Sequence, residues 1–191
     1  IDPVTGAVTT FAGTMASPGI VNATGTAAKF NRPCGLAIDA QDNIYVADAS
    51  NNVVRKITPA GVVSTFAGAG TAGSADGAAT TATFNSPTDM AITPAGVMYV
   101  ADQVNHVIRK IENGQVTTIA GLAGTLGNVN GTGSAARFNQ PSWVTLAPDG
   151  TLLIRDGANS GNIRKLDPAT GVVTSFAAGA ASLYSGVGVD S

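Results

Sequence analysis

Short apolar segments recur along the whole chain, and clusters of Gly, Pro, Asn and Asp separate them. The segments are a few residues long and rich in Val, Ile, Phe and Tyr, which is typical of β-strands. No window keeps the period of an amphipathic helix. Between segments, Pro94-Ala95-Gly96 and Pro148-Asp149-Gly150 supply the fixed and positive φ angles of tight turns. The pattern predicts an all-β chain of short strands joined by hairpin turns.

One motif, Phe-Asn-x-Pro, begins three copies of an internal repeat. It starts at Phe30, Phe84 and Phe138, each 54 residues after the one before. An Asp and an Arg-Lys pair recur behind it, and the third Arg-Lys pair comes one residue late because that copy has an insertion near residues 159–162. These markers are Asp48, Asp102, Asp156, Arg55-Lys56, Arg109-Lys110 and Arg164-Lys165. Three independent markers at one spacing are strong evidence for a repeat.

Each copy contains four candidate strands. The first is predicted at residues 35–39, 89–93 and 143–147, and the second at residues 44–47, 98–101 and 152–155. The third is predicted at residues 53–57, 107–111 and 162–166, and the fourth at residues 62–67, 115–120 and 172–177. Four-stranded units in series are the signature of β-propeller blades. We therefore predict an all-β fold, a β-propeller arc of three complete four-stranded blades plus the outer strand of a preceding blade.

The repeat also predicts the domain boundaries. Residues 1–29 are expected to be the end of a preceding blade and its connector, because residues 1–13 match residues 166–178. Residues 30–83 form blade 1, residues 84–137 blade 2, and residues 138–191 blade 3 with the start of the next connector. Both ends fall inside the repeat. We expect the ring to need further blades from the same longer chain, or a second copy, for closure.

The order of motifs within each copy resembles the NHL-repeat family of β-propellers. Phe-Asn-x-Pro is followed by an apolar strand, Asn-Ile-Tyr-Val-Ala-Asp, Asn-x-Val-x-Arg-Lys-Ile and Val-x-Thr-Phe-Ala-Gly, most fully at residues 30–67. Asp76-Gly77 resembles the connector of bacterial members, and Asn22 and Asn130 occupy the equivalent position. The resemblance implies six blades most often, with each first strand lining a central channel. It implies no single activity, since members include sensors, RNA-binding domains, adhesion modules and a peptide-amidating lyase.

Composition narrows the classes of partner. Charged residues make up 12% of the chain, with a net charge of −2, which argues against a nucleic-acid partner bound through phosphates. No apolar run reaches the ~20 residues of a membrane span, so no membrane insertion is expected. The single Cys34 excludes an internal disulfide. Abundant Gly, Ala, Thr and Ser with few charges are typical of secreted microbial proteins, which predicts an extracellular or cell-surface location.

The recurrent acidic and basic residues are expected to be structural. Each Asp closes the second strand, and a short carboxylate there accepts loop N–H groups and pairs with the Arg of the next strand. The predicted latch consists of Asp48, Asp102, Asp156, Arg55, Arg109 and Arg164. Asn22 and Asn130 each begin a glycosylation pattern, Asn-Ala-Thr and Asn-Gly-Thr, and each also occupies the turn position of the connector. The turn interpretation explains both positions.

Positions where the copies disagree are the candidates for binding. The residue two past the motif Pro is Gly35, Asp89 and then Trp143, and the residue before the strand-two Asp is Ala47, Ala101 and then Arg155. The scaffold alone would keep these positions alike, and Trp is enriched at binding hot spots. The expected contact residues are Trp143, Arg155, Asp89, Thr88, His106 and Arg32. The alternatives are ordinary drift, or a Trp143 that packs at the channel mouth.

These residues favour binding over catalysis. His106 is the only histidine, and one His cannot supply the several metal ligands of an amidating lyase. Cys34 and His106 lie in different blades, and nothing in the sequence joins them into a triad. We predict a non-catalytic module that binds a protein or a glycan, without cofactor or metal. The alternatives are a propeller enzyme of lyase or lactonase type and a structural repeat in a surface assembly.

Overall fold

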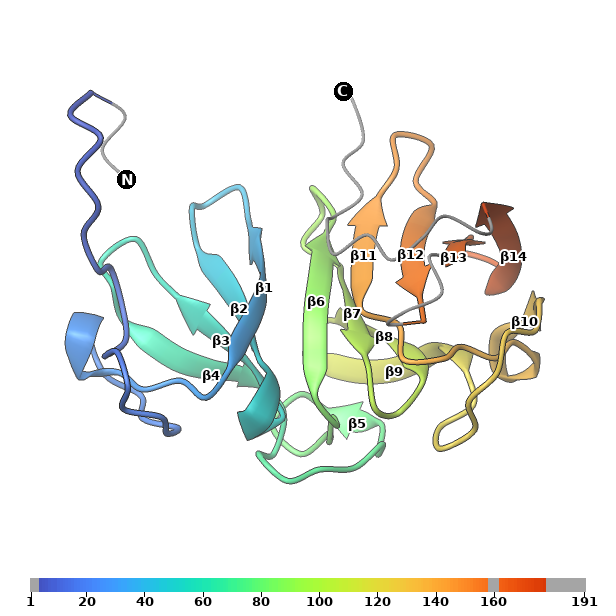
Figure 1. Cartoon of the computed structure of the whole chain (residues 1–191), viewed down its shortest axis with the longest axis horizontal. Helices are drawn as coiled ribbons and strands as arrows, with labels where there is room; N and C mark the ends of the chain where they lie inside the picture. The colour runs from blue at the N-terminus through green and yellow to red at the C-terminus, as the bar shows by residue number, and fades with distance from the viewer. Residues whose placement is uncertain (1–3, 158–161, 178–191) are drawn as a thin grey trace.

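The computed structural model describes residues 4–157 and 162–177. Its strands form three antiparallel sheets, blades 1 to 3, fanned side by side in an open arc (Figure 1). Blade 1 contains β1 (Pro33–Ile38), β2 (Ile44–Asp48), β3 (Val53–Ile57) and β4 (Val63–Ala67). Blade 2 contains β6 (Pro87–Ile92), β7 (Met98–Asp102), β8 (Val107–Glu112) and β9 (Gln115–Gly121). Blade 3 contains β11 (Trp143–Leu146), β12 (Leu152–Asp156), β13 (Asn162–Leu166) and β14 (Val172–Ala177).

The predicted fold class is confirmed. Every strand predicted within the three copies is present, and the observed bounds differ from the predicted ones by at most two residues. The largest difference is at β1 and β6, which begin at the motif Pro rather than two residues later. There the ladder is irregular between Pro33 and Leu36, and between Pro87 and Asp89. A bulge at this point explains why the alternation of the sequence becomes visible only after it.

The connectors take part in the sheets. The short strands β5 (Gly77–Ala78) and β10 (Gly131–Thr132) pair with β9 and β14, the outermost strands of the blades that follow them. In blade 1, an isolated bridge between Thr24 and Val62 takes the same place. Three 3-10 turns complete the described elements, η1 (Gly25–Ala27), η2 (Ala49–Asn51) and η3 (Gly133–Ala135). Each connector therefore belongs by its pairing to the following blade, whereas the expected boundaries at 84 and 138 group it with the preceding one.

Residues 1–13 were expected to contain the outer strand of a preceding blade, and the structure describes residues 4–13 of this segment. Their backbone is not assigned to a strand. Gly13 N–H donates to the carbonyl of Gly25 at 3.1 Å. A β-strand forms only beside another strand, and within the described residues no ladder flanks this segment.

The core lies between the blades, because strand residues alternate between two faces. We call the face toward the next blade the forward face and the face toward the preceding blade the backward face. The forward face of blade 1, with Tyr45, Ala47 and Val54, packs on the backward face of blade 2, with Met90, Met98 and Val100. Blade 2 repeats this packing, with Tyr99, Ala101 and Ile108 against Val144, Leu152 and Ile154. Small and large side chains thus meet at the same positions in both interfaces.

Candidate functional site

A buried ion pair lies at the end of β2 in blade 1. Asp48 Oδ2 accepts a hydrogen bond from Arg55 Nη1 at 3.0 Å, and both side chains are fully buried. Asp48 Oδ1 accepts the N–H of Asn31 at 2.7 Å. The same guanidinium donates to the carbonyls of Lys29 and Val21. Charge-assisted bonds of this kind fix the connector to the blade in a defined position.

Blades 2 and 3 repeat the arrangement. Nη1 of Arg109 lies 2.9 Å from Asp102 Oδ2, and Nη1 of Arg164 lies 2.9 Å from Asp156 Oδ2. The motif Phe covers each guanidinium, at 5.0 Å in blade 1 and 5.4 Å in blade 3. The expected pairing of each Asp with the following Arg is therefore present in all three blades. This arrangement explains why Phe-Asn-x-Pro recurs in the three copies, since the Phe ring covers the Arg guanidinium and the Asn N–H donates to the Asp carboxylate.

A third residue joins each latch, and the sequence reasoning missed it. Nη2 of Arg109 donates to Asp76 Oδ1 at 2.8 Å. Asn22 Oδ1 receives Arg55 Nη2 at 2.7 Å, and Asn130 Oδ1 receives Arg164 Nη2 at 2.8 Å. These connector residues all precede the motif Phe by the same number of positions, and that common offset was the available signal. The contacts give the turn interpretation of Asn22 and Asn130 a definite structural role.

The variable residue of the motif faces the neighbouring blade. Arg32, Ser86 and Gln140 all have a left-handed backbone, with φ of 56°, 56° and 57°. The Ser86 N–H donates to Asn52 Oδ1 at 2.9 Å, and the Gln140 N–H donates to His106 Nδ1 at 3.1 Å. Arg32 Nη2 also donates to Ser86 Oγ at 2.7 Å. Among the expected contact residues, Arg32 and His106 thus link adjacent blades.

His106 acts in this link as a hydrogen-bond acceptor. Partial burial lowers the pKa of its imidazole, although the nearby Asp156 carboxylate acts in the opposite direction. A neutral ring with its proton on Nε2 leaves Nδ1 free to accept from Gln140. The position is filled by Asn52 in the first copy, which provides an equivalent acceptor.

Asp89 joins the first strands of the three blades. Its Oδ2 accepts the N–H of Val144 in blade 3 at 3.0 Å, and its side chain is buried. Burial raises the pKa of this carboxyl to about 6, while backbone N–H groups oppose the shift. On the other side lies Gly35, where a Cβ atom would stand 2.0 Å from Asp89 Oδ1 and 2.6 Å from its Cα. The absent side chain of Gly35 provides the space that Asp89 occupies. The hydroxyl of the preceding Thr88 lies 3.5 Å from the Ala101 carbonyl.

Trp143 and Arg155 are direct cross-strand partners in β11 and β12. Both side chains are partly exposed. Trp143 occupies the position of Gly35 and Asp89, and Arg155 occupies the position of Ala47 and Ala101. In blades 1 and 2, the residues at both positions contact the following blade. The pair therefore belongs to the forward face of blade 3, and we call it the Trp143–Arg155 surface. A groove of about 370 Å³ between β1, β6 and β11 reaches Asp89 and Trp143.

Within residues 4–157 and 162–177, His, Cys, Asp and Glu side chains form no group of three able to hold a metal ion. In the same residues, no helix has the length and apolarity to cross a membrane. Cys34 is a free, exposed thiol on β1. Its Sγ lies 3.4 Å from the Arg32 carbonyl oxygen, to which the thiol donates a weak hydrogen bond.

Comparison with known proteins agrees with this geometry. Residues 30–57, which carry the motif, β1, β2 and β3 of blade 1, match the family described as NHL repeat. This chain is built from NHL repeats. The protein SUPPRESSOR OF QUENCHING 1, chloroplastic, from Arabidopsis thaliana is 37% identical to the NHL chain over 153 residues. The match covers 75% of the NHL chain but only 14% of the plant protein.

Solved structures extend the similarity to between 72% and 80% of the chain. A protein of unknown function from Bacteroides thetaiotaomicron has a TM-score of 0.61 and 26% identity, covering 72% of the NHL chain and 33% of its own. An auxiliary nutrient binding protein from Bacteroides ovatus has a TM-score of 0.61 and 17% identity, over 80% and 37% of the two chains. A gluconolactonase from Xanthomonas campestris has a TM-score of 0.57 and 16% identity, over 78% and 48%. The last two show the fold alone, which serves binding proteins and enzymes alike.

Proposed function

We propose that the NHL chain is a non-catalytic binding module whose principal contacts come from the Trp143–Arg155 surface. One observation carries this proposal. At two neighbouring positions where blades 1 and 2 have small or buried side chains, blade 3 places a Trp and an Arg opposite each other, both partly exposed. Trp and Arg are the residues most enriched at binding hot spots. A packing requirement shared by all blades would not select them at this one site.

The two side chains favour a ligand with a flat or apolar portion beside an acidic group. The indole presents a large rigid face at a small cost in conformational entropy. The guanidinium presents a planar set of donors that fits a carboxylate. A protein loop with an acidic residue or an acidic glycan fits this description. The adjoining groove of about 370 Å³ offers room for such a segment.

The proposed location is outside the cell or at its surface. Its support is compositional, since charged residues make up 12% of the chain against ~25% in an average soluble domain. Proteolysis of intact cells of the source organism tests it. Release of peptides from this chain before lysis supports the location, and release only after lysis contradicts it.

Glycan and peptide arrays probed with the labelled chain test the proposed function. Three variants are compared with the unmodified chain, namely Trp143→Ala, Arg155→Ala and the control Phe11→Ala. Phe11 is an exposed aromatic residue outside blade 3. The proposal predicts array signals that the first two variants lose and the control keeps. Signals shared by all four proteins, or no signal on either array, would contradict it.

A further inference from the structure

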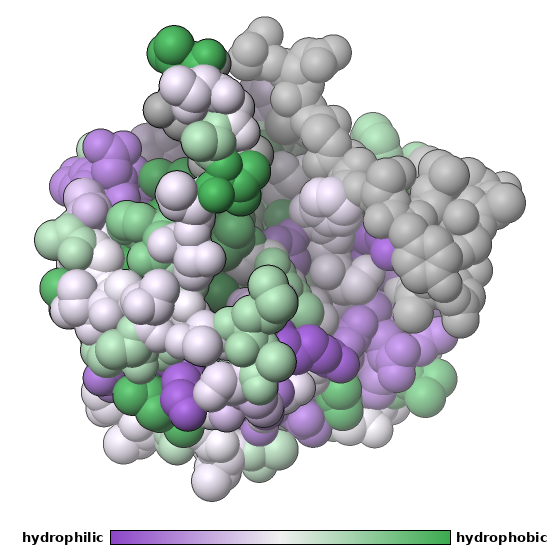
Figure 2. Space-filling view, turned by 60° about the vertical axis from the view of Figure 1, so that its left-hand side comes forward, coloured by the Kyte–Doolittle hydropathy of each residue, from purple (hydrophilic) through white to green (hydrophobic). Residues whose placement is uncertain are grey.

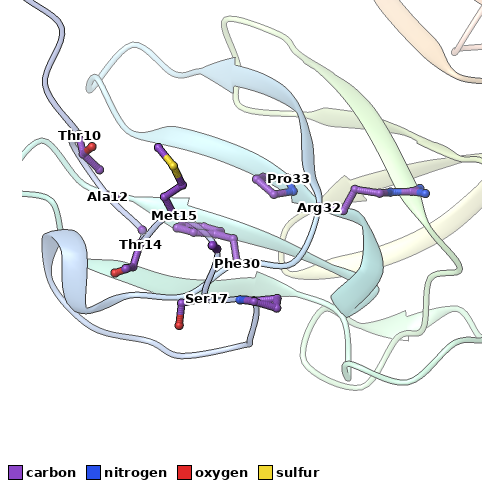
Figure 3. A pocket seen from close by; sticks show the side chains of 11 residues that line it. Thr10, Ala12, Thr14, Met15, Ser17, Phe30, Arg32 and Pro33 are labelled. Atoms are coloured by element: carbon purple, nitrogen blue, oxygen red, sulfur yellow. The ribbon is translucent and has the colours of Figure 1, made fainter.

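Two hollows flank blade 1, and they differ in the charge that they offer. The lining of the first, of about 410 Å³, includes Phe30, Arg32 and the segment from Thr10 to Pro18 (Figure 3). With this side of the molecule turned forward, apolar and weakly polar residues surround a recess (Figure 2). Arg32, the one charged residue among those described in the lining, extends away from Met15 and Phe30 (Figure 3) and donates to Ser86 Oγ. The first hollow therefore directs no charge at a ligand.

The second hollow lies between blades 1 and 2 and is lined by polar groups. Its volume is about 450 Å³, within the range of roughly 300–1,000 Å³ typical of small-molecule sites. Blade 1 supplies Asp39 and Asn43 from the β1–β2 turn, Tyr45 from β2 and Lys56 from β3, and blade 2 supplies residues 92–96. Both walls belong to this chain, so the hollow does not depend on further blades. We call it the Lys56 groove.

Lysines occupy the same position on the third strand of all three blades, and in blades 2 and 3 they are paired. Lys110 Nζ lies 2.9 Å from Glu112 Oε2. Lys165 Nζ lies 2.9 Å from Asp149 Oδ2. The two acids come from different positions of the blade, so the repeat neutralises this lysine in two different ways.

Blade 1 has an acid at neither position. Thr58 and Gln41 stand at the two positions that carry acids in the other blades. Within the described part of the chain, the Lys56 ammonium forms no ion pair. It lies 5.6 Å from the centre of the Tyr45 ring. This cation–π contact holds the charge at the groove, and the ammonium keeps its hydrogen-bond donors for a ligand.

The side chains beside Lys56 present oxygen acceptors. Asp39 Oδ1 accepts the N–H groups of Gln41 and Asn43, each at 2.9 Å. Its Oδ2 accepts the Tyr45 hydroxyl at 3.1 Å and the Asn43 side-chain amide at 2.8 Å. These bonds fix the wall of the groove, and they leave the Asn43 carbonyl oxygen and the lone pairs of the Tyr45 hydroxyl as acceptors. The groove therefore combines one cation with acceptors suited to hydroxyl groups.

We propose that the Lys56 groove is a second binding site, independent of the Trp143–Arg155 surface, for a small carboxylate rich in hydroxyl groups, such as an acidic monosaccharide. The ligand carboxylate takes the place of the acid that pairs with the lysine in blades 2 and 3. The ligand hydroxyls donate to the oxygens of Asn43 and Tyr45. The Asp39 charge beside them disfavours a doubly charged anion such as phosphate.

Titration of the ¹⁵N-labelled full chain with D-glucuronate, followed by its backbone amide shifts, tests the proposal. We expect saturable shifts at Asn43 and Gly96, which line the groove on its two sides. D-Glucose has the hydroxyls without the carboxylate, and acetate has the carboxylate without the hydroxyls. Each of these probes, and inorganic phosphate, should bind at least about tenfold more weakly than D-glucuronate.

Three variants with a matched control identify the groups responsible. Lys56→Gln removes the ammonium, and Gln41→Asp copies the acid of blade 3 and should occupy Lys56. Both should weaken D-glucuronate binding at least about tenfold. Lys110→Gln, the control, removes the paired lysine of blade 2 and should leave the affinity unchanged. Trp143→Ala should also bind D-glucuronate normally, so failure of this site and failure of the Trp143–Arg155 surface are distinguishable.

Several results would overturn the proposal. They are shifts that do not saturate, shifts centred on Trp143 instead of Asn43, and undiminished binding by Lys56→Gln. Equal affinity for D-glucuronate and for acetate, D-glucose or phosphate would also overturn it, because the groove would then not combine the two kinds of contact. The amide spectrum of each variant outside the groove shows that it is folded before affinities are compared.

Discussion

The carboxylate of Asp89 accepts the backbone N–H of Val144 at 3.0 Å, and so one buried side chain connects the first strands of blades 2 and 3. Gly35 in blade 1 leaves the space for it. The sequence shows only that these positions differ between copies. Together the three residues form a contact between neighbouring first strands, where a small residue in one blade makes room for a polar residue in the next.

Asp89 makes the stability of the arc depend on pH. Its pKa is raised from 3.8 to about 6, mainly by burial. A raised native pKa means that the folded state binds the proton more tightly, so the stabilising contribution is complete below pH 4 and is lost as pH rises through about 6. Asp89→Asn keeps an acceptor for Val144 without a titrating group. Between pH 7.5 and 5, the unmodified chain should gain roughly 1–2 kcal/mol in free energy of unfolding relative to this variant. Urea denaturation of both proteins measures this gain. An equal difference in their free energy of unfolding at the two pH values would contradict the assignment.

Gly35→Ala should destabilise the chain although its φ angle is ordinary for any residue. The added Cβ would stand 2.6 Å from the Cα of Asp89 and 2.8 Å from the Thr88 carbonyl, both backbone atoms that have little room to move. We expect a loss of about 2 kcal/mol or more from overpacking. Gly96→Ala is the control, because nothing lies within 4 Å of its added Cβ and only its φ of 82° opposes the change. A Gly35→Ala variant no less stable than Gly96→Ala would show that blades 1 and 2 do not meet as described.

Arg109→Met should test the buried latch. The change leaves the Asp102 carboxylate buried without its cation, which typically costs about 3–5 kcal/mol. Asp102→Asn combined with Arg109→Met removes the stranded charge and should recover part of the loss. Because burial already raises the pKa of Asp102 to about 6, the single variant should also lose less stability at pH 5 than at pH 8. Urea denaturation at both pH values measures each difference. Additive losses in the double variant would contradict a coupled pair.

His106 should give the opposite dependence on pH. Burial lowers the pKa of its imidazole below 6.5, so its contribution is present above pH 6.5 and is lost as pH falls through the native value. Protonation also removes the acceptor that Nδ1 offers to Gln140. His106→Asn copies the first blade, where Asn52 accepts the corresponding N–H. Because Asn does not titrate, this variant should retain more of its stability below pH 6.5 than the unmodified chain does. The direction is opposite to that of the Asp89 effect. Identical acid profiles by thermal denaturation would refute the proposed role.

The sequence predicted the architecture well, because the signals for it are local. Turn residues such as Gly96 and Gly150 determine where strands end. Asp and Arg recur at equivalent positions in the three copies, which indicates which strands pair. It also predicted the ion pairs Asp48–Arg55, Asp102–Arg109 and Asp156–Arg164, which join neighbouring strands of one blade.

The sequence did not predict the contacts between blades. Asp89 was expected at a binding face, but it lies in a buried contact with Val144, because first strands from three blades converge there. Trp143 and Arg155 were grouped correctly as neighbours, yet nothing in their spacing indicates that they lie on the forward face of blade 3. The role of Asp76 beside Arg109 depends on the path of the connector along the next blade, which a repeat length does not reveal.

The most direct test of the binding proposal is the dissociation constant of the strongest array ligand for the unmodified chain, for Trp143→Ala and for Phe11→Ala, by isothermal titration calorimetry. We predict that Trp143→Ala weakens binding by at least about 2 kcal/mol, close to thirtyfold, as expected at a hot spot, while its Tm and the affinity of Phe11→Ala stay near those of the unmodified chain. Unchanged affinity in a folded Trp143→Ala variant would contradict the proposal that this surface binds the ligand.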